Sequence, residues 1–178
     1  MKLFHLSDLH IGKRVNEFSM IEDQKYILKR ILDLAEEEKP DGIILAGDVY
    51  DKQIPSAEAV QVFDEFITRL AGRAIPVFII SGNHDSAERL AFGGRLLNSR
   101  GIYLSPVYDG SVTKIPLKDQ YGTVWIHLLP FIRPSTVRHV FENEADLVTD
   151  VQTAAETVIR HMEIDLKDRN ILVAHQFV

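Results

Sequence analysis

Residues 41–51 read DGIILAGDVYD, an apolar run that ends in a glycine and an acid. A continuous apolar run of this length, bounded by turn residues, is typical of a strand buried on both faces of a parallel sheet. Two similar runs flank it in the sequence, KLFHLSD at 2–8 and IPVFIIS at 75–81. The first hundred residues therefore predict three buried strands, each followed by polar residues.

Helical patterns separate these runs. Apolar residues recur at helical spacing from 19 to 38, which predicts one helix there. A second helix is expected after Ser56, which can cap it, and Gly72 suits its end. A third is expected from Ser86 to about Asn98. Strands that alternate with helices of this length indicate parallel βαβ units, so the predicted fold class is α/β.

The second half of the chain has a different pattern. Two strands with a turn between them are expected to pair antiparallel, two helices follow, and one more apolar run ends the sequence. These segments are 111–117, 123–131, 135–143, 147–162 and 170–178. A strand so close to the end of a sequence is unusual for a complete domain, and we expect the chain to be cut short.

Composition and charge are those of an ordinary globular domain. The 178 residues are 46% hydrophobic and 26% charged, and they include no cysteine, which excludes disulfides and thiolate metal sites. We expect a cytoplasmic protein without a membrane span or signal peptide. The formal net charge of −6 has the wrong sign for a broad basic surface that holds nucleic acid, although bound cations can reverse the local field.

Polar side chains follow four of the expected strands. They are Asp8 and His10, then Asp48, then Asn83 and His84, and finally His175. Ligands of open α/β sheets bind beyond the carboxyl ends of the strands, so these side chains converge at one rim if the strands are neighbours. Each motif alone has an ordinary explanation as a turn or a helix cap. The four together favour a metal site.

The donor types indicate which metals would bind. Carboxylates, imidazoles and one amide suit manganese, iron or zinc. Six donors exceed the need of one tetrahedral ion, and Asp48 could bridge two ions with its two oxygens. Two metals about 3.5–4 Å apart are the usual arrangement for displacement at phosphorus.

Three short motifs carry a family resemblance. DLH at 8–10, GDVYD at 47–51 and GNHD at 82–85 resemble the first three motifs of the calcineurin-like metallophosphoesterases. Their flanking residues are similar to those of the nuclease subunits of SbcC–SbcD-type DNA-repair complexes, most closely over residues 1–105. Ser/Thr protein phosphatases fit less well, because this chain lacks their Arg-Gly after the second motif and has Asp85 in place of glutamate.

The resemblance implies a layered α-β-β-α sandwich and a role for each matched residue. Asp8 and His10 would hold one ion, Asp48 would bridge, and Asn83 and His175 would hold the other, with Mn²⁺ the expected metal. His84 would face the scissile phosphate and protonate the departing sugar oxygen, while a metal-bound hydroxide attacks in line. Asp85 completes the catalytic pair by orienting His84 or its loop.

The resemblance also implies partners and an incomplete motif set. The family pattern continues to a Gly-His-x-His motif, a capping region and a segment that docks the ATPase, so residues 1–178 are expected to be the N-terminal part of the nuclease domain. DNA, an SbcC-type ATPase and a second copy of the chain are the implied partners. Two alternatives stay open: an enzyme for small phosphate esters, and a silent fragment that only self-associates through helices carrying Phe63, Phe66 and Leu70, or Leu90, Leu96 and Leu97.

Overall fold

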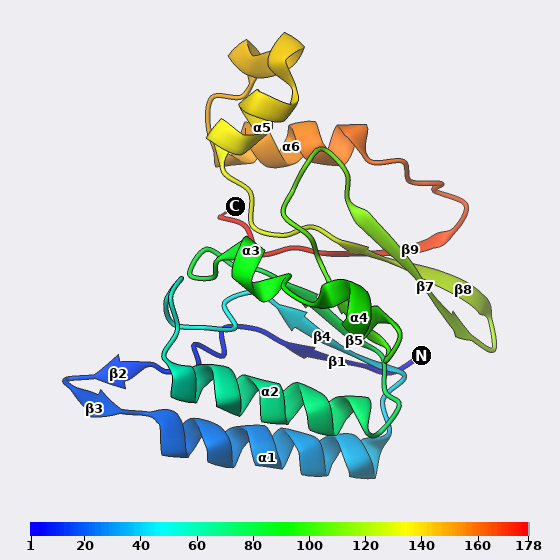
Figure 1. Cartoon of the computed structure of the whole chain (residues 1–178). Helices are drawn as coiled ribbons and strands as arrows, with labels where there is room; N and C mark the ends of the chain where they lie inside the picture. The colour runs from blue at the N-terminus through cyan, green and yellow to red at the C-terminus, as the bar shows by residue number, and fades with distance from the viewer. Residues whose placement is uncertain (178) are drawn as a thin grey trace.

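The computed structural model describes residues 1–177, which form two facing sheets with helices outside them (Figure 1). The first sheet is parallel and has the order β1-β4-β5-β6. Its strands are β1 (Leu3–Leu6), β4 (Gly42–Ala46), β5 (Val77–Ile80) and β6 (Ile102–Leu104). The three predicted strands are confirmed, and the short β6 is an addition to them.

The second sheet contains β7 (Thr113–Asp119), β8 (Gly122–Leu128) and β9 (Arg169–Val173). As expected, β7 and β8 pair antiparallel, whereas β9 pairs parallel to β8. The last strand therefore belongs to the second sheet and not to the one that carries the first three motifs. The sequence predicted a shared rim on the condition that the four strands are neighbours, and for β9 that condition does not hold.

Two helices cover the outer face of the first sheet, α1 (Ile21–Glu38) and α2 (Ala57–Ala71) (Figure 1). Ser56 caps α2 as expected, because its hydroxyl accepts a hydrogen bond from the Ala59 amide at 3.2 Å. Phe63, Phe66 and Leu70 of α2 are buried in the core beneath the sheet. These side chains cover the sheet and are not free to form a helical bundle with a second chain.

The expected helix from Ser86 to Asn98 is two short helices, α3 (Ala87–Leu90) and α4 (Gly94–Asn98). The break covers residues 91–93, and Gly93, the N-cap of α4, has a φ of 75°, a left-handed conformation that interrupts a helix and that glycine adopts freely. A small hairpin of β2 (Arg14–Val15) and β3 (Phe18–Ser19), which the sequence did not predict, projects beside α1 and α2 (Figure 1).

The second helical layer consists of α5 (Pro134–Val140), a 3₁₀ turn (Glu142–Leu147) and α6 (Val151–His161), beyond the second sheet (Figure 1). Between the sheets lies a separate apolar layer that includes Phe78 and Ile80 from one side and Ile126 and Leu128 from the other. The arrangement confirms the expected layered sandwich. None of the helices in residues 1–177 is long and apolar enough to cross a membrane.

Candidate metal centre

The carboxyl ends of β1 and β4 continue into two loops that run side by side. The amide of Asp8 donates to the Gly47 carbonyl at 3.1 Å, and that of His10 donates to the Asp48 carbonyl at 2.9 Å. Gln24 of α1 secures the first loop, since its side-chain amide donates to the carbonyl of His10 at 2.7 Å. Gln24 is a positioning residue that the sequence did not reveal, because a polar residue in the first turns of a helix is unremarkable.

Three of the predicted ligands have unusual backbone conformations. Asp8, His10 and Asp48 have φ values of 57°, 43° and 51°. A residue other than glycine loses roughly 1–3 kcal/mol in such a conformation, and it persists only where surrounding contacts enforce it. Strained residues of this kind gather at functional sites. Three of the seven non-glycine residues with positive φ in residues 1–177 are predicted ligands, which agrees with the positions chosen from the motifs.

Two glycines allow the donors to approach one another. A Cβ atom on Gly82 would lie 2.1 Å from Asp48 Oδ1, and one on Gly47 would lie 2.5 Å from His175 Cγ. Neither position can hold a side chain while Asp48 and His175 stay in place. In the sequence, Gly47 and Gly82 are the first residues of the GDVYD and GNHD motifs. There they indicated only turns, and the close approach of Asp48 and His175 could not be inferred from them.

The predicted ligands converge around Asp48, which is 2% exposed. Its Oδ2 lies 3.7 Å from His10 Nε2 and 3.5 Å from His175 Nε2. His10 Nε2 also lies 3.7 Å from Asp8 Oδ1, and His175 Nε2 lies 3.1 Å from Asn83 Oδ1. All five side chains therefore meet at one place, although His175 arrives from the second sheet.

His84 lies beside this cluster and is exposed to solvent. Its backbone amide donates to Asp48 Oδ1 at 2.9 Å, and its Nδ1 lies 3.0 Å from the Asp51 carbonyl oxygen. The ring meets that of His10 edge to face, with centroids 4.8 Å apart. These contacts fix the ring while leaving Nε2 without a hydrogen bond to any of residues 1–177.

Asp85 is buried beneath the loop and does not face the cluster. Its carboxylate accepts hydrogen bonds from the amides of Gly82, Val49 and Tyr50, at 2.8–3.1 Å. Burial raises the pKa of Asp85, and the three amide donors oppose that shift. In the structure this carboxylate ties the GNHD loop to the loop after β4, so it supports the positions of Asn83 and His84.

Comparison with known proteins decides the family. The family model for calcineurin-like phosphoesterases matches residues 1–176. The chain belongs to this family. The SbcD component of the nuclease SbcCD from Staphylococcus epidermidis is 35% identical over 178 residues, which cover 98% of this chain and 46% of the relative. The chain thus spans about half the length of the curated relative that it matches.

The donors fit the divalent metals that calcineurin-like phosphoesterases bind. Two overlapping sets, His10–Asp48–His84 and Asp8–Asp48–His175, each bring their ligand atoms within 4.8 Å of one another. Ligands bound about 2.1 Å from one ion lie roughly 3.0–3.4 Å apart. The separations of 3.5–3.7 Å that join His10 to Asp8 and join Asp48 to His10 and His175 therefore need little closure. Asp48 belongs to both sets, as a bridging carboxylate would. His84 geometrically completes the first of these sets.

One atom of His10 supports this fit. Its Nδ1 is buried and forms no hydrogen bond within residues 1–177, while Asp51 Oδ1 lies 3.7 Å away. At metal sites in general, a histidine ligand commonly donates its other ring nitrogen to a carboxylate, which orients the ring. A small movement of Asp51 would complete that contact.

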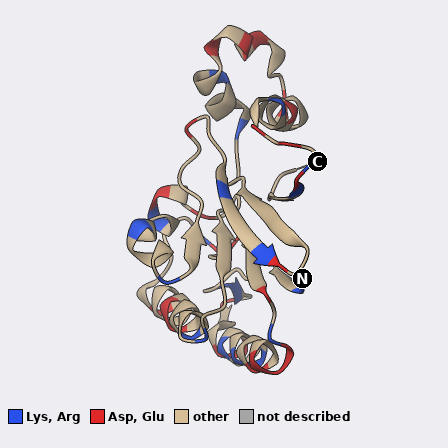
Figure 2. Cartoon of the chain, turned by 90° about the vertical axis from the view of Figure 1, so that its right-hand side faces the viewer, with Lys and Arg blue, Asp and Glu red and all other residues tan. Residues whose placement is uncertain are grey.

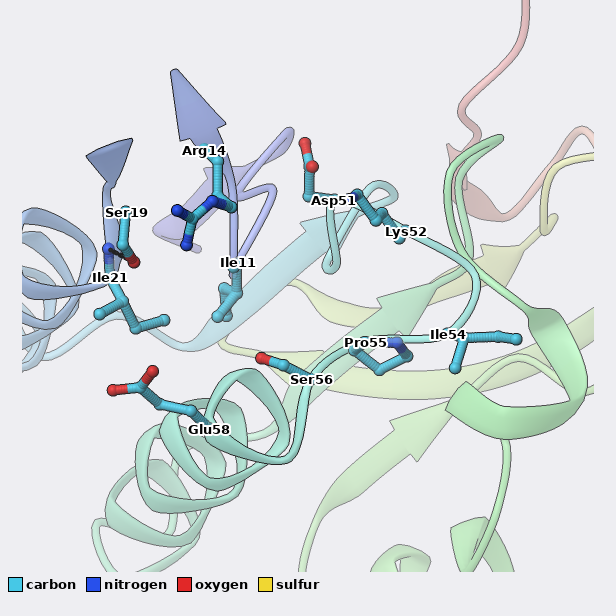
Figure 3. Close-up of a pocket in the computed structure, with 11 residues that line it drawn as sticks. Ile11, Arg14, Ser19, Ile21, Asp51, Lys52, Ile54, Pro55, Ser56 and Glu58 are labelled. Atoms are coloured by element: carbon cyan, nitrogen blue, oxygen red, sulfur yellow. Dashed lines mark hydrogen bonds between the residues drawn. The ribbon is translucent and has the colours of Figure 1, made fainter. Parts of the chain in front are cut away.

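Two pockets flank the candidate metal centre of this calcineurin-like phosphoesterase. One, of about 360 Å³, lies between Asp51 and the start of α2, and Arg14 and Lys52 are on its lining (Figure 3). The other, of about 310 Å³, extends from Asn83 to the segment 131–136. A phosphate held at the centre would therefore have room for a group on either side.

Proposed function

We propose that this chain is the metal-dependent phosphodiesterase part of a DNA nuclease similar to the SbcD component of SbcCD. The observation that carries the proposal is the convergence of Asp8, His10, Asn83 and His175 around the buried Asp48, next to the imidazole of His84, whose Nε2 has no hydrogen bond within residues 1–177. The 35% identity to a nuclease component supports DNA as the substrate.

In this proposal, five residues hold two divalent ions, and Mn²⁺ is the expected metal. They are Asp8, His10, Asp48, Asn83 and His175, whose oxygen and imidazole donors suit that ion. Bound ions would polarise a phosphoryl oxygen and acidify water. Asp85 and Gln24 act through backbone hydrogen bonds. Asp85 accepts from the amide of Tyr50 in the loop after β4, and Gln24 donates to the carbonyl of His10 in the loop after β1.

His84 supplies the proton to the leaving sugar oxygen. Because its Nδ1 faces the Asp51 carbonyl, which can only accept, the proton on Nδ1 is fixed and Nε2 is the nitrogen that exchanges protons. With both nitrogens protonated, the ring keeps its bond to Asp51 and presents Nε2–H to the substrate. General acid catalysis of this type contributes roughly 10²–10⁴-fold to the rate.

The test is Mn²⁺-dependent release of nucleotides from labelled linear DNA by the 178-residue chain. His84→Ala should lower release by about 10²–10⁴-fold and leave Mn²⁺ uptake, measured by calorimetry, close to that of the wild type. Asp48→Ala should weaken uptake of both ions. If His84→Ala abolished Mn²⁺ uptake, His84 would be a ligand instead of the acid. If the wild type released no nucleotides, that result would contradict hydrolysis by this chain.

A second candidate is hydrolysis of small phosphate esters, which the modest volumes of the flanking pockets favour. Turnover of bis(p-nitrophenyl) phosphate without turnover of DNA would support it.

The expected partners of the nuclease are an SbcC-type ATPase and a second copy of the chain in DNA repair. Phe92 and Leu96, which are 86% and 79% exposed, are the apolar residues of the α3–α4 region available for self-association.

A further inference from the structure

We propose that the pocket between the GNHD loop and the segment 131–136 is a nucleotide subsite, which binds one nucleotide of single-stranded DNA beside the scissile phosphate. The inference rests on the proposed phosphodiesterase function and adds to it a substrate contact and the residues that make it. This cleft is lined by Asn83, Ser86, Tyr108, Phe131, Arg133 and Thr136, among others. Because Asn83 also belongs to the metal cluster, the cleft and the centre are continuous.

Arg133 provides an unpaired positive charge at the cleft. The residue is exposed, and its guanidinium forms neither an ion pair nor a hydrogen bond with any of residues 1–177. The segment that presents it is fixed, since the Phe131 amide donates to the Ser81 carbonyl at 2.8 Å. The acidic residues of the cleft have other contacts: Glu88 accepts from Ser86 Oγ at 2.8 Å, and Asp85 binds backbone amides. A guanidinium in this position suits a phosphate oxygen.

An aromatic pair borders the same cleft. Phe131 meets Phe177 edge to face, with ring centroids 5.6 Å apart and an interplanar angle of 77°. Phe177 is 60% exposed, and Phe131 is partly exposed. Aromatic faces of this kind stack on the bases of single strands, and they do so without sequence preference because every base has a π face.

Tyr108 adds a hydroxyl to the lining. The residue is 6% exposed, and its ring packs in a cluster with Leu129 and Ile132. Within residues 1–177 the hydroxyl has no hydrogen-bond partner, so it is available to a ligand in the cleft. Burial raises the pKa of Tyr108 to about 12, so the hydroxyl stays protonated and can donate to a ligand oxygen.

The lining fits one nucleotide better than a duplex or a peptide. A duplex is held by many phosphate contacts, whereas the net charge is −6 and basic and acidic residues are intermixed along the helices in Figure 2. A volume of about 310 Å³ is at the lower end of small-ligand sites. The guanidinium of Arg133 matches a phosphate, and the ring of Phe131 matches a base. The hydroxyl of Tyr108 matches a sugar or phosphate oxygen.

The test is fluorescence anisotropy with a short labelled oligothymidylate in EDTA, repeated over a series of salt concentrations. Arg133→Ala should weaken binding about tenfold and reduce the slope of log K against log[salt] by about 0.7, the loss of one phosphate contact on a single strand. Phe131→Leu should weaken binding at least fivefold with the slope unchanged, because stacking is not a charge contact. Tyr108→Phe, which removes only the hydroxyl, should weaken binding twofold or more.

Arg100→Ala is the matched control, because this exposed arginine precedes β6 at the opposite end of the first sheet. It should bind like the wild type, and thermal melting confirms that each variant is folded. Absence of oligonucleotide binding by the wild type, or equal slopes for the wild type and Arg133→Ala, would overturn the subsite. Cleavage is scored separately with Mn²⁺, so binding through the cleft without cleavage contradicts the proposed function and leaves the subsite standing.

Discussion

The distance between Gly82 and Asp48 shows how single residues set the geometry of the centre. The donor residues could be predicted from sequence because carboxylates, amides and imidazoles at strand ends have few other uses together. The contribution of Gly82 could not, because a close approach of two loops depends on tertiary structure. Only in the structure does a Cβ at Gly82 fall 2.1 Å from Asp48 Oδ1.

Gly82→Ala should therefore displace the GNHD loop, lower the melting temperature and weaken Mn²⁺ binding at least tenfold. The new methyl group would push apart the GNHD loop and the buried Asp48 carboxylate. That movement would break the hydrogen bond that the His84 amide donates to Asp48. Gly94→Ala is the control, since its Cβ would be 3.7 Å from Leu104 and its position is helical. That change should be neutral or stabilise by about 0.5–1 kcal/mol.

Asp85→Ala should lower the free energy of unfolding by about 3 kcal/mol or more. The change leaves the amides of Gly82, Val49 and Tyr50 without their acceptor, and each buried unsatisfied group costs about 1–3 kcal/mol. Denaturant unfolding measures the loss. Asp146→Ala, which removes an exposed carboxylate without a hydrogen bond or ion pair in residues 1–177, should stay within about 0.5 kcal/mol of the wild type, and an equal loss there would contradict a specific role for Asp85.

At the scale of elements, long periodic segments were predictable and short ones were not. β4 and α2 were recognised because five to fifteen residues repeat one pattern. β6 has only three residues, and its strand conformation depends on pairing with Val77–Ile79 of β5, which no local pattern encodes. The hairpin β2–β3 is shorter still.

The start of α2 offers a direct test of a predicted element boundary. Ser56→Ala should lower the free energy of unfolding by about 1 kcal/mol, because the Ala59 amide loses its capping oxygen. The corresponding drop in melting temperature is about 2–4 °C for a chain of this size. Ser99→Ala, at the end of α4, should change melting less, since its hydroxyl donates to an exposed carbonyl.

The second sheet carries a pH-dependent clamp. Arg169 of β9 donates to both oxygens of Asp119 of β7, at 3.1 and 2.7 Å. Hydrogen bonding to Arg169 holds the pKa of Asp119 below its ordinary value of 3.8. The clamp therefore stabilises the fold above that pH, and the stabilisation is lost as the pH falls further. Asp119→Asn should melt earlier at pH 7, with a difference from the wild type that shrinks below about pH 4.

At the scale of the molecule, the sequence predicted both sheets but not how they share the centre. A polar residue at a strand end indicates a rim, and it does not say which sheet the strand joins. β9 pairs with β8, and His175 reaches Asp48 only because the two sheets face each other across a common apolar layer. The position of His175 follows from sheet packing, a long-range property.

Metal binding should consequently stabilise the whole fold. At a Mn²⁺ concentration 100 times the dissociation constant, the free energy of unfolding should rise by about 2.7 kcal/mol, and EDTA should reverse the gain. Differential scanning calorimetry measures it. Asp48→Asn should show little gain, and an equal gain in that variant would place the stabilising ion elsewhere.

The origin of the donors in two sheets also has a consequence for biosynthesis. His175 follows Asn83, its hydrogen-bonding partner, by 92 positions. A ribosome needs about 5–20 s to add that many residues. During this interval the nascent first sheet presents an incomplete donor set, and the full set of donors forms only when the second sheet docks. Chain elongation thus delays assembly of the hydrolytic centre until most of the sandwich has formed.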